Sequence, residues 1–279
     1  MTTAGALFVF AIGLIIGSFL NVVIFRYNSG MKVTGRSKCF SCAHTLHWYE
    51  LIPLVSFLVL QGRCRHCKSR LSLQYFMVEL LTGIVFTLTV ARLAEAGYIA
   101  LTFASAAAFA LSLLYLAAMA ILIVISVYDL RHKIIPDGLA YAFAFLALLR
   151  IAAAFSIDPT YPWALDIASG ALLSLFFVGL WYFSRGRWMG LGDGKLVLGM
   201  GWFLPFTENI AAVLVAFWGG AIVGIALLVM THVMKRYSKA PMTMKSELPF
   251  APFLIAGLFF VFLFDIDLAT LVRVLQFIV

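Results

Sequence analysis

Long apolar stretches separated by short polar ones dominate the pattern of this chain. A helix that crosses a membrane needs about 20 mostly apolar residues. Eight stretches approach that length, at residues 5–25, 76–96, 100–128, 138–156, 165–184, 194–206, 209–230 and 250–264. The first continues into Arg26 without a small-residue cleavage site, so we expect a retained helix and not a removable signal peptide. The pattern therefore predicts an all-α, polytopic membrane helix bundle of about eight spans.

One long polar interruption divides this pattern. It covers residues 26–75 and contains a shorter apolar run, LIPLVSFLVLQG at 51–62. That run is too short to span a membrane and predicts a helix that lies either at the membrane surface or against the bundle. We expect an amino-terminal unit over residues 1–95, made of one span, this loop and a second span, followed by a membrane bundle over residues 96–279.

Composition and charge support the membrane assignment and add an orientation. Hydrophobic residues make up 64% of the chain and charged residues 11%, which is typical of a protein in a bilayer. If the amino terminus faces outward, Arg92, Arg150 and Arg273 lie outside and the other 17 of the 20 Lys and Arg residues lie in the cytosol. This bias follows the positive-inside rule. The net charge of +8 therefore indicates membrane anchoring, and no basic–aromatic surface module indicates nucleic-acid binding.

All four cysteines lie in the 26–75 loop, as two Cys-x-x-Cys pairs. The pairs are Cys39 with Cys42 and Cys64 with Cys67. Two such pairs can supply four thiolates in the closed tetrahedral geometry of a structural zinc site. Disulfides are the alternative, but they rarely persist in the reducing cytosol, where the charge pattern places this loop. We therefore predict a structural zinc ion, with His44, His47 and His66 as bystanders.

Two aspartates stand next to apolar runs at the predicted cytosolic face. Asp129 lies near the end of one run, and Asp193 lies in the motif MGLGDGKLV. Two carboxylates brought together can share a proton, so that one activates water and the other protonates the scissile carbonyl, as in aspartic proteases. The flanking Gly190, Gly192 and Gly194 would allow positive φ angles and the close approach of an extended peptide. The alternatives are helix capping or a surface charge for each aspartate, and the proton path of a proton-coupled transporter for the pair.

Local charges predict how this pair would share a proton. Asp193 lies near a helix amino terminus and two residues from Lys195, which favours its ionised form. Asp129 lies at a helix carboxyl end, which favours its protonated form. Asp137 follows Pro136 and is expected to begin the next helix instead of acting as a third catalytic acid.

These motifs resemble those of the type IV prepilin peptidases, bacterial members of the GxGD intramembrane aspartic proteases. The aspartates stand in SVYDLRHKIIPD and GLGDGKL, and the two Cys-x-x-Cys pairs, GSFLNVVIFR at 17–26, VELLTG at 78–83 and LPFAPFLIAG at 248–257 agree in order along the chain. The chain departs from the family pattern at two places. QYF at 74–76 stands where the family has Arg-Tyr-Pro, and Ala251 stands where it has Gly.

The resemblance implies a function for these motifs. It implies catalytic roles for Asp129 and Asp193 and metal binding by the four cysteines. The substrates would be type IV prepilins and type II secretion pseudopilins, cleaved after their basic leader at the cytosolic face of a bacterial inner membrane, with lipid around the spans. It also implies methylation of the new amino terminus with S-adenosylmethionine. Glu79, in the second span, is a candidate for that activity, and a polar contact between helices is its alternative.

Two further alternatives remain open from the sequence. The chain could be a different GxGD protease, or the cysteine loop could be a docking module for pilus or secretion machinery. The resemblance implies no particular oligomeric state.

Overall fold

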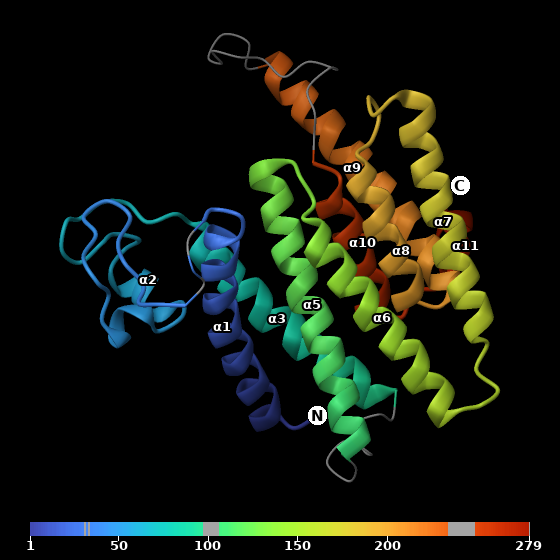
Figure 1. The fold of residues 1–279 in the computed structure, drawn as a ribbon, viewed down its shortest axis with the longest axis horizontal. Helices are drawn as coiled ribbons and strands as arrows, with labels where there is room; N and C mark the ends of the chain where they lie inside the picture. The colour runs from blue at the N-terminus through green and yellow to red at the C-terminus, as the bar shows by residue number, and fades with distance from the viewer. Residues whose placement is uncertain (31, 33, 97–105, 234–248, 279) are drawn as a thin grey trace. The chain divides into compact units, whose positions relative to one another are not determined.

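The computed structural model describes residues 1–30, 32, 34–96, 106–233 and 249–278. Its named elements are all helices (Figure 1), so the predicted all-α class is confirmed. The chain divides into two compact units, Met1–Val124 and Ile125–Val279. Four of the basic residues predicted to be cytosolic lie outside the described residues, as does the beginning of the 100–128 stretch. These four are Lys235, Arg236, Lys239 and Lys245.

Within the described ranges, six helices are long and apolar enough to cross a membrane. They are α1 (Thr3–Arg26), α3 (Gln74–Glu95), α5 (Ala106–His132), α6 (Asp137–Ile157), α7 (Trp163–Ser184) and α9 (Phe206–Val233). The stretches at 194–206 and 250–264 form shorter helices, α8 (Leu191–Phe203) and α10 (Ala251–Phe264). A helix of that length rises only about 20 Å, less than a hydrocarbon core of about 30 Å. The last helix is α11 (Leu268–Ile278).

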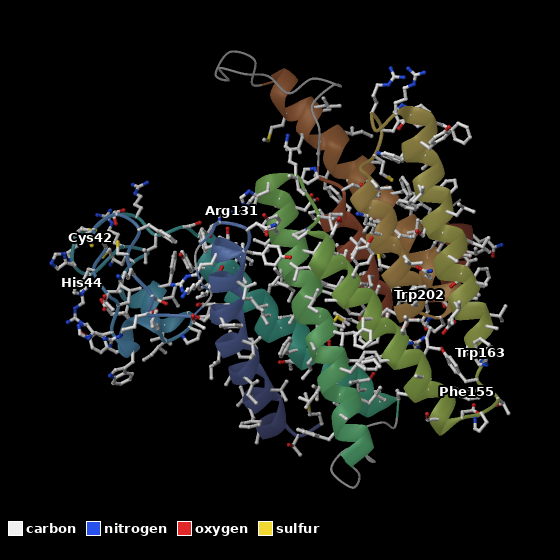
Figure 2. The ribbon with its side chains drawn as sticks, viewed as in Figure 1. Cys42, His44, Arg131, Phe155, Trp163 and Trp202 are labelled. Carbon is white, nitrogen blue, oxygen red and sulfur yellow. The ribbon has the colours of Figure 1, made fainter. Side chains whose placement is uncertain are left out.

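Helix α7 shows why such a segment matches a bilayer. It begins after Pro162 and ends where Arg185 takes a left-handed conformation with φ 53°. Trp163 and Tyr182 lie near its two ends and are both exposed. These rings are separated by a rise of about 29 Å along the helix, close to the thickness of the hydrocarbon core. Amphipathic aromatic side chains favour the two membrane–water interfaces, and Figure 2 shows Phe155 of α6 near the same end as Trp163.

In the first unit, α1 packs against α3 through small residues. A Cβ atom on Gly13 would lie 2.7 Å from the Cα of Gly83, and one on Gly17 would lie 2.8 Å from the Cα of Glu79. Gly13 and Gly17 form a GxxxG motif, which allows the close approach of two helices in a membrane. The fully buried Asn21 adds a polar link, because its Nδ2 donates to the Tyr75 carbonyl at 3.2 Å.

The loop between α1 and α3 contains two short helical elements, η1 (Trp48–Leu51) and α2 (Val55–Val59). The helix predicted over residues 51–62 is therefore wrong in extent, since only five of those residues are α-helical. The physical reason is local. Pro53 has no N–H to donate, and Leu54 takes a positive φ of 57°, which breaks the helical path before Val55.

In the second unit, α8 is the buried helix and packs against both α6 and α7. A Cβ atom on Gly201 of α8 would lie 2.3 Å from the Cα of Gly170 of α7, so the two backbones touch. A buried ion pair joins α6 to α7, with Arg150 Nη2 2.6 Å from Asp166 Oδ2. The Tyr161 hydroxyl bonds to both partners, which adds hydrogen bonds to the buried ion pair.

Candidate functional site

Asp129 lies in the last turn of α5 and is buried, with 5% of its surface exposed. The helix ends there because Lys133 takes a positive φ of 54° and donates its N–H to the Asp129 carbonyl at 2.7 Å. The Asp129 carboxylate accepts a hydrogen bond from the backbone N–H of Ala251, the first residue of α10. The positive end of a second helix therefore faces this carboxylate.

The Ala251 contact was not predicted from the sequence, where Ala251 stood out only as a departure from the family motif. The contact is made by a backbone N–H, which Ala and Gly both carry. This departure therefore leaves the hydrogen bond to Asp129 in place. No side-chain pattern could have indicated the contact, because it depends on how α10 packs against the end of α5.

Asp193 is the third residue of α8, outside the six spanning helices, and is 7% exposed. Its Oδ2 accepts the N–H of Gly190, the residue that precedes the helix, at 3.1 Å. This bond satisfies one of the free N–H groups at the helix start. The local sequence thus places the carboxylate at the positive end of its own helix.

The flanking glycines do not have the predicted conformation. Gly190 has a φ of −78°, and neither Gly192 nor Gly194 is among the positive-φ residues of the described chain. The expectation of positive φ angles is wrong because the last two lie inside α8. These two glycines instead allow close packing around α8. A Cβ atom on Gly192 would lie 3.0 Å from the Ile135 side chain, and one on Gly194 would lie 3.0 Å from the Val178 side chain.

Asp129 and Asp193 belong to the same unit, close enough that their charges interact. Burial raises the pKa of Asp193 to about 7 against the opposing hydrogen bond from Gly190, and the charge of Asp129 raises it further. Half of the Asp193 side chains therefore carry a proton near neutral pH. Two buried carboxylates of which one holds a proton are the arrangement of an aspartic protease dyad.

The prediction that Asp193 is readily ionised is wrong for two reasons. Burial in α8 outweighs the effect of the helix amino terminus. In addition, Lys195 points to another acid, because its Nζ lies 2.7 Å from Asp137 Oδ1. Asp137 begins α6, as its position after Pro136 predicted. Lys195 therefore links α8 to the start of α6 instead of neutralising the dyad.

The four cysteines come together in the first unit. The Sγ atoms of Cys39, Cys42, Cys64 and Cys67 lie within 4.8 Å of one another. The Sγ atoms of Cys39 and Cys67 are 3.8 Å apart. A tetrahedral zinc ion with Zn–S bonds of about 2.3 Å needs sulfurs about 3.8 Å apart, so this donor set fits the metal.

The two cysteine pairs also share one backbone design. The N–H of Cys39 donates to the His44 carbonyl at 2.9 Å, and the N–H of Cys64 donates to the Ser69 carbonyl at 2.9 Å. In each pair the residue four positions after the first cysteine, Ala43 or Lys68, has a φ of 57°. Both loops are therefore the same tight turn, in which the two thiols of a pair converge on one point.

Local hydrogen bonds favour the thiolate form, which a metal requires, at two of the four cysteines, Cys39 and Cys67. Burial raises the pKa of Cys39, but backbone hydrogen bonds from Cys42 and Ser41 lower it, to about 6 overall. The rings of His44 and His66 stack on each other with centroids 4.9 Å apart. They are outside the four-cysteine cluster, but His44 also belongs to a second group of possible metal ligands, with His47 and Glu50. The role of the three histidines as bystanders therefore stays a prediction.

Glu79 lies one turn into α3 and is 7% exposed. Its Oε2 accepts the N–H of Leu54 at 2.9 Å, and the Ser18 side chain also bonds to this carboxylate. Glu79 therefore holds the positive-φ turn before α2 against α1 and α3. A polar contact within the unit, one of the two predicted roles, is present.

The fold and the two clusters of side chains together define a class of protein. It is a multi-span helical membrane protein with a buried aspartate pair and a four-cysteine loop. Residues 11–93 match the Bacterial Peptidase A24 N-terminal domain, and residues 116–225 match the Type IV leader peptidase family. The chain belongs to that family.

Individual relatives agree with this assignment. The chain is 35% identical to the prepilin leader peptidase/N-methyltransferase of Myxococcus xanthus, over 81% of this chain and 64% of that protein. It is 31% identical to the Burkholderia pseudomallei protein of the same name, over 90% of this chain and 82% of the relative. For the Bacillus subtilis protein these values are 30%, 91% and 92%. No solved structure matches the chain.

Proposed function

We propose that this protein cleaves the basic leader from type IV prepilins and type II secretion pseudopilins. The observation that carries the proposal is the buried, electrostatically coupled pair of Asp129 and Asp193 in a chain of the type IV leader peptidase family. Each carboxylate is held by a backbone N–H at the start of a helix. These bonds hold both carboxylates in place through uncharged backbone groups and not through a lysine or arginine. The two carboxylates can therefore share one proton.

The dyad supports a general acid–base mechanism. The ionised carboxylate of Asp129 removes a proton from a water molecule, whose oxygen attacks the scissile carbonyl carbon. Asp193, protonated below a pH of about 7, donates its proton to the carbonyl oxygen. The tetrahedral intermediate then collapses: the C–N bond breaks, the leaving amine takes the proton that Asp129 received, and one hydroxyl of the new carboxyl group returns its proton to Asp193. Exclusion of bulk water from the pair supports this exchange.

The second proposed activity is methylation of the new amino terminus. The Myxococcus and Burkholderia relatives are named as N-methyltransferases as well as leader peptidases. S-adenosylmethionine would supply the methyl group from its sulfonium sulfur. The four cysteines would hold a structural zinc ion. We assign both methylation and metal binding to the first unit, whose loop the metal would stabilise.

We also propose an orientation in the bacterial inner membrane. The amino terminus faces the periplasm, and the cysteine loop and both aspartates face the cytosol, because 12 of the 14 Lys and Arg residues that precede α8 then lie on the cytosolic side. Substrate leaders would meet the dyad from that side.

The intact mass of a purified prepilin tests both activities. We expect incubation with this protein to remove the leader, and addition of S-adenosylmethionine to make the product heavier by one methyl group. A prepilin of unchanged mass, with a working family member as positive control, would refute the peptidase proposal. A cleaved product that gains no methyl group would refute the second activity alone.

A further inference from the structure

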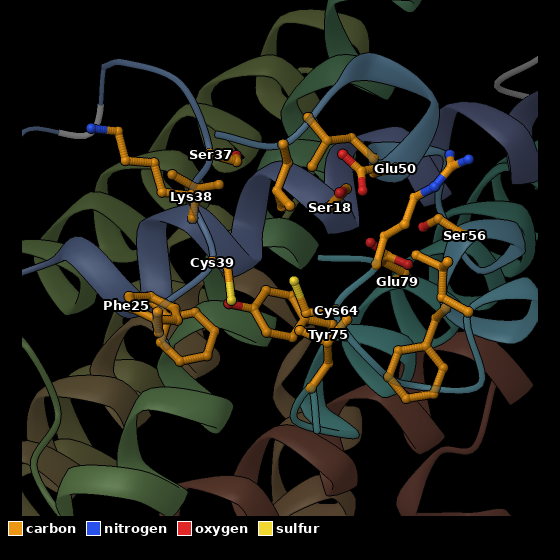
Figure 3. Close-up of a pocket in the computed structure, with 18 of the residues that line it drawn as sticks. Ser18, Phe25, Ser37, Lys38, Cys39, Glu50, Ser56, Cys64, Tyr75 and Glu79 are labelled. Atoms are coloured by element: carbon orange, nitrogen blue, oxygen red, sulfur yellow. The ribbon is translucent and has the colours of Figure 1, made fainter. Parts of the chain in front are cut away.

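A pocket in the first unit has no role in peptide cleavage. It lies where α1 ends and α3 begins, and the loop with η1, α2 and both cysteine pairs forms its other walls. The pocket contains about 1000 Å³ of space free of atoms, including its open mouth. Figure 3 shows two carboxylates, Glu50 and Glu79, at one side and the rings of Phe25 and Tyr75 beside Cys39 and Cys64 at the other.

The acidic side of the pocket lacks a cationic partner for its deepest group. Glu79 is 7% exposed. Arg26, Lys38 and Arg65 also line the pocket, but among the described residues none of them forms a salt bridge with Glu79. Its bonds are to the Leu54 N–H and to Ser18. Glu50 is half-buried and uses one oxygen to accept the His47 N–H at 2.8 Å. A buried carboxylate is costly unless a positive charge lies beside it, so a cationic ligand would be stabilised here.

The opposite side of the pocket offers a flat aromatic surface. The rings of Phe25 and Tyr75 stack with centroids 5.0 Å apart and an interplanar angle of 21°. The backbone of Tyr75 is held in place by a hydrogen bond, because its carbonyl accepts the side-chain amide N–H of the buried Asn21. A planar heteroaromatic ring can stack on such a surface. The pocket thus combines two carboxylates, three basic side chains and an aromatic platform.

We propose that this pocket binds S-adenosylmethionine, with Glu79 and Glu50 recognising the sulfonium charge and the Phe25–Tyr75 pair receiving the purine. The inference rests on the proposed methyl transfer and adds to it the location of the donor site. The donor carries a positive sulfur next to a planar base, which is the combination that the two sides of the pocket match. The cysteine pairs form part of the wall, so the metal would shape this site without touching the donor.

Equilibrium binding to the full-length protein in detergent tests the proposal, with no peptide present. The two probes are S-adenosylmethionine and S-adenosylhomocysteine, which lacks the sulfonium charge. We expect Glu79→Gln and Glu50→Gln each to weaken S-adenosylmethionine binding about tenfold or more, and S-adenosylhomocysteine binding threefold or less. The matched control is Glu95→Gln, at the far end of α3, which should bind both probes as the wild type does.

The aromatic side has its own variant. Tyr75→Leu removes the stacked ring and should weaken both probes to a similar degree, because the purine is common to them. Glu50→Gln keeps the test decisive if Glu79→Gln fails to fold, since Glu50 is only half-buried and its replacement leaves the contact between Glu79 and Leu54 intact. Equal loss of both probes in the glutamate variants, or unchanged binding in them, would overturn the proposal.

The same samples separate this inference from the proposed function. A wild-type protein that methylates a cleaved prepilin while both glutamate variants bind the donor normally would place the donor elsewhere and leave the function intact. A wild-type protein that cleaves prepilin but binds neither probe would remove the methylation proposal together with this site. The peptidase proposal would then stand on the dyad alone.

Discussion

Replacing Asp193 with Asn should stabilise the folded protein, and more so at alkaline than at acidic pH, while abolishing peptide cleavage. Burial raises the pKa of Asp193 from 3.8 to about 7. Between these two pH values the unfolded chain has released the proton and the folded protein still holds it. Folding stability therefore falls as the pH rises from 3.8 towards 7, and the full loss is present above 7. Asn carries no proton to release and should lack this loss.

The size of the effect follows from the pKa shift. Three pKa units correspond to about 4 kcal/mol of lost stability above pH 7, at about 1.4 kcal/mol per unit. At pH 5 the loss is only about 2 kcal/mol. The advantage of Asp193→Asn over the wild type should therefore grow by about 2 kcal/mol between pH 5 and pH 8. For a chain of this size that is a difference of roughly 5 °C in Tm.

Thermal unfolding in detergent, followed by tryptophan fluorescence at pH 5 and pH 8, measures this difference. The matched control is Asp137→Asn, which removes another carboxylate of the same unit from a side chain that is 60% exposed and paired with Lys195. An Asp193→Asn advantage that is the same at both pH values, or greater at pH 5, would refute the claim that burial raises the Asp193 pKa.

Three other predictions follow from the site and the packing. The kcat/KM for prepilin cleavage should fall as the pH rises above about 7, because Asp193 then loses its proton. Lys195→Gln should leave the pH of this fall unchanged; a changed pH would show that Lys195 acts on the dyad. Elemental analysis should find one zinc per chain, absent in Cys64→Ser and retained in His66→Ala. Gly201→Ala should cost about 1–3 kcal/mol through overpacking, seen as a lower Tm, whereas Gly179→Ala, with open space around it, should change it by less than about 1 kcal/mol.

Much of this fold could be predicted from hydrophobic runs because crossing a membrane imposes a simple length rule on helices. The rule also explains where prediction was less accurate. The 194–206 and 250–264 stretches are apolar enough to suggest spans, but α8 is apolar because protein surrounds it, with Gly201 against Gly170. Hydropathy alone does not distinguish burial in lipid from burial in protein.

The candidate site shows a similar division between local and long-range information. The spacing within each Cys-x-x-Cys pair predicted the cysteine cluster, because this signal lies within a few residues of the chain. The protonation of Asp193 depends on burial and on Asp129, far away in sequence, and the nearby Lys195 was misleading for that reason. The GxxxG motif at Gly13 and Gly17 is a local signal for the close packing of α1 against α3. The Arg150–Asp166 pair had no comparable local signal.

The most direct test of the central claim is the intact mass of a prepilin after incubation with the wild type, Asp129→Asn, Asp193→Asn and Asp137→Asn proteins at matched folded concentration. An aspartyl dyad predicts loss of the leader with the wild type and Asp137→Asn, and an uncut prepilin with each of the other two. Leader removal by either dyad variant at the wild-type rate would contradict the assignment of Asp129 and Asp193 as the catalytic pair.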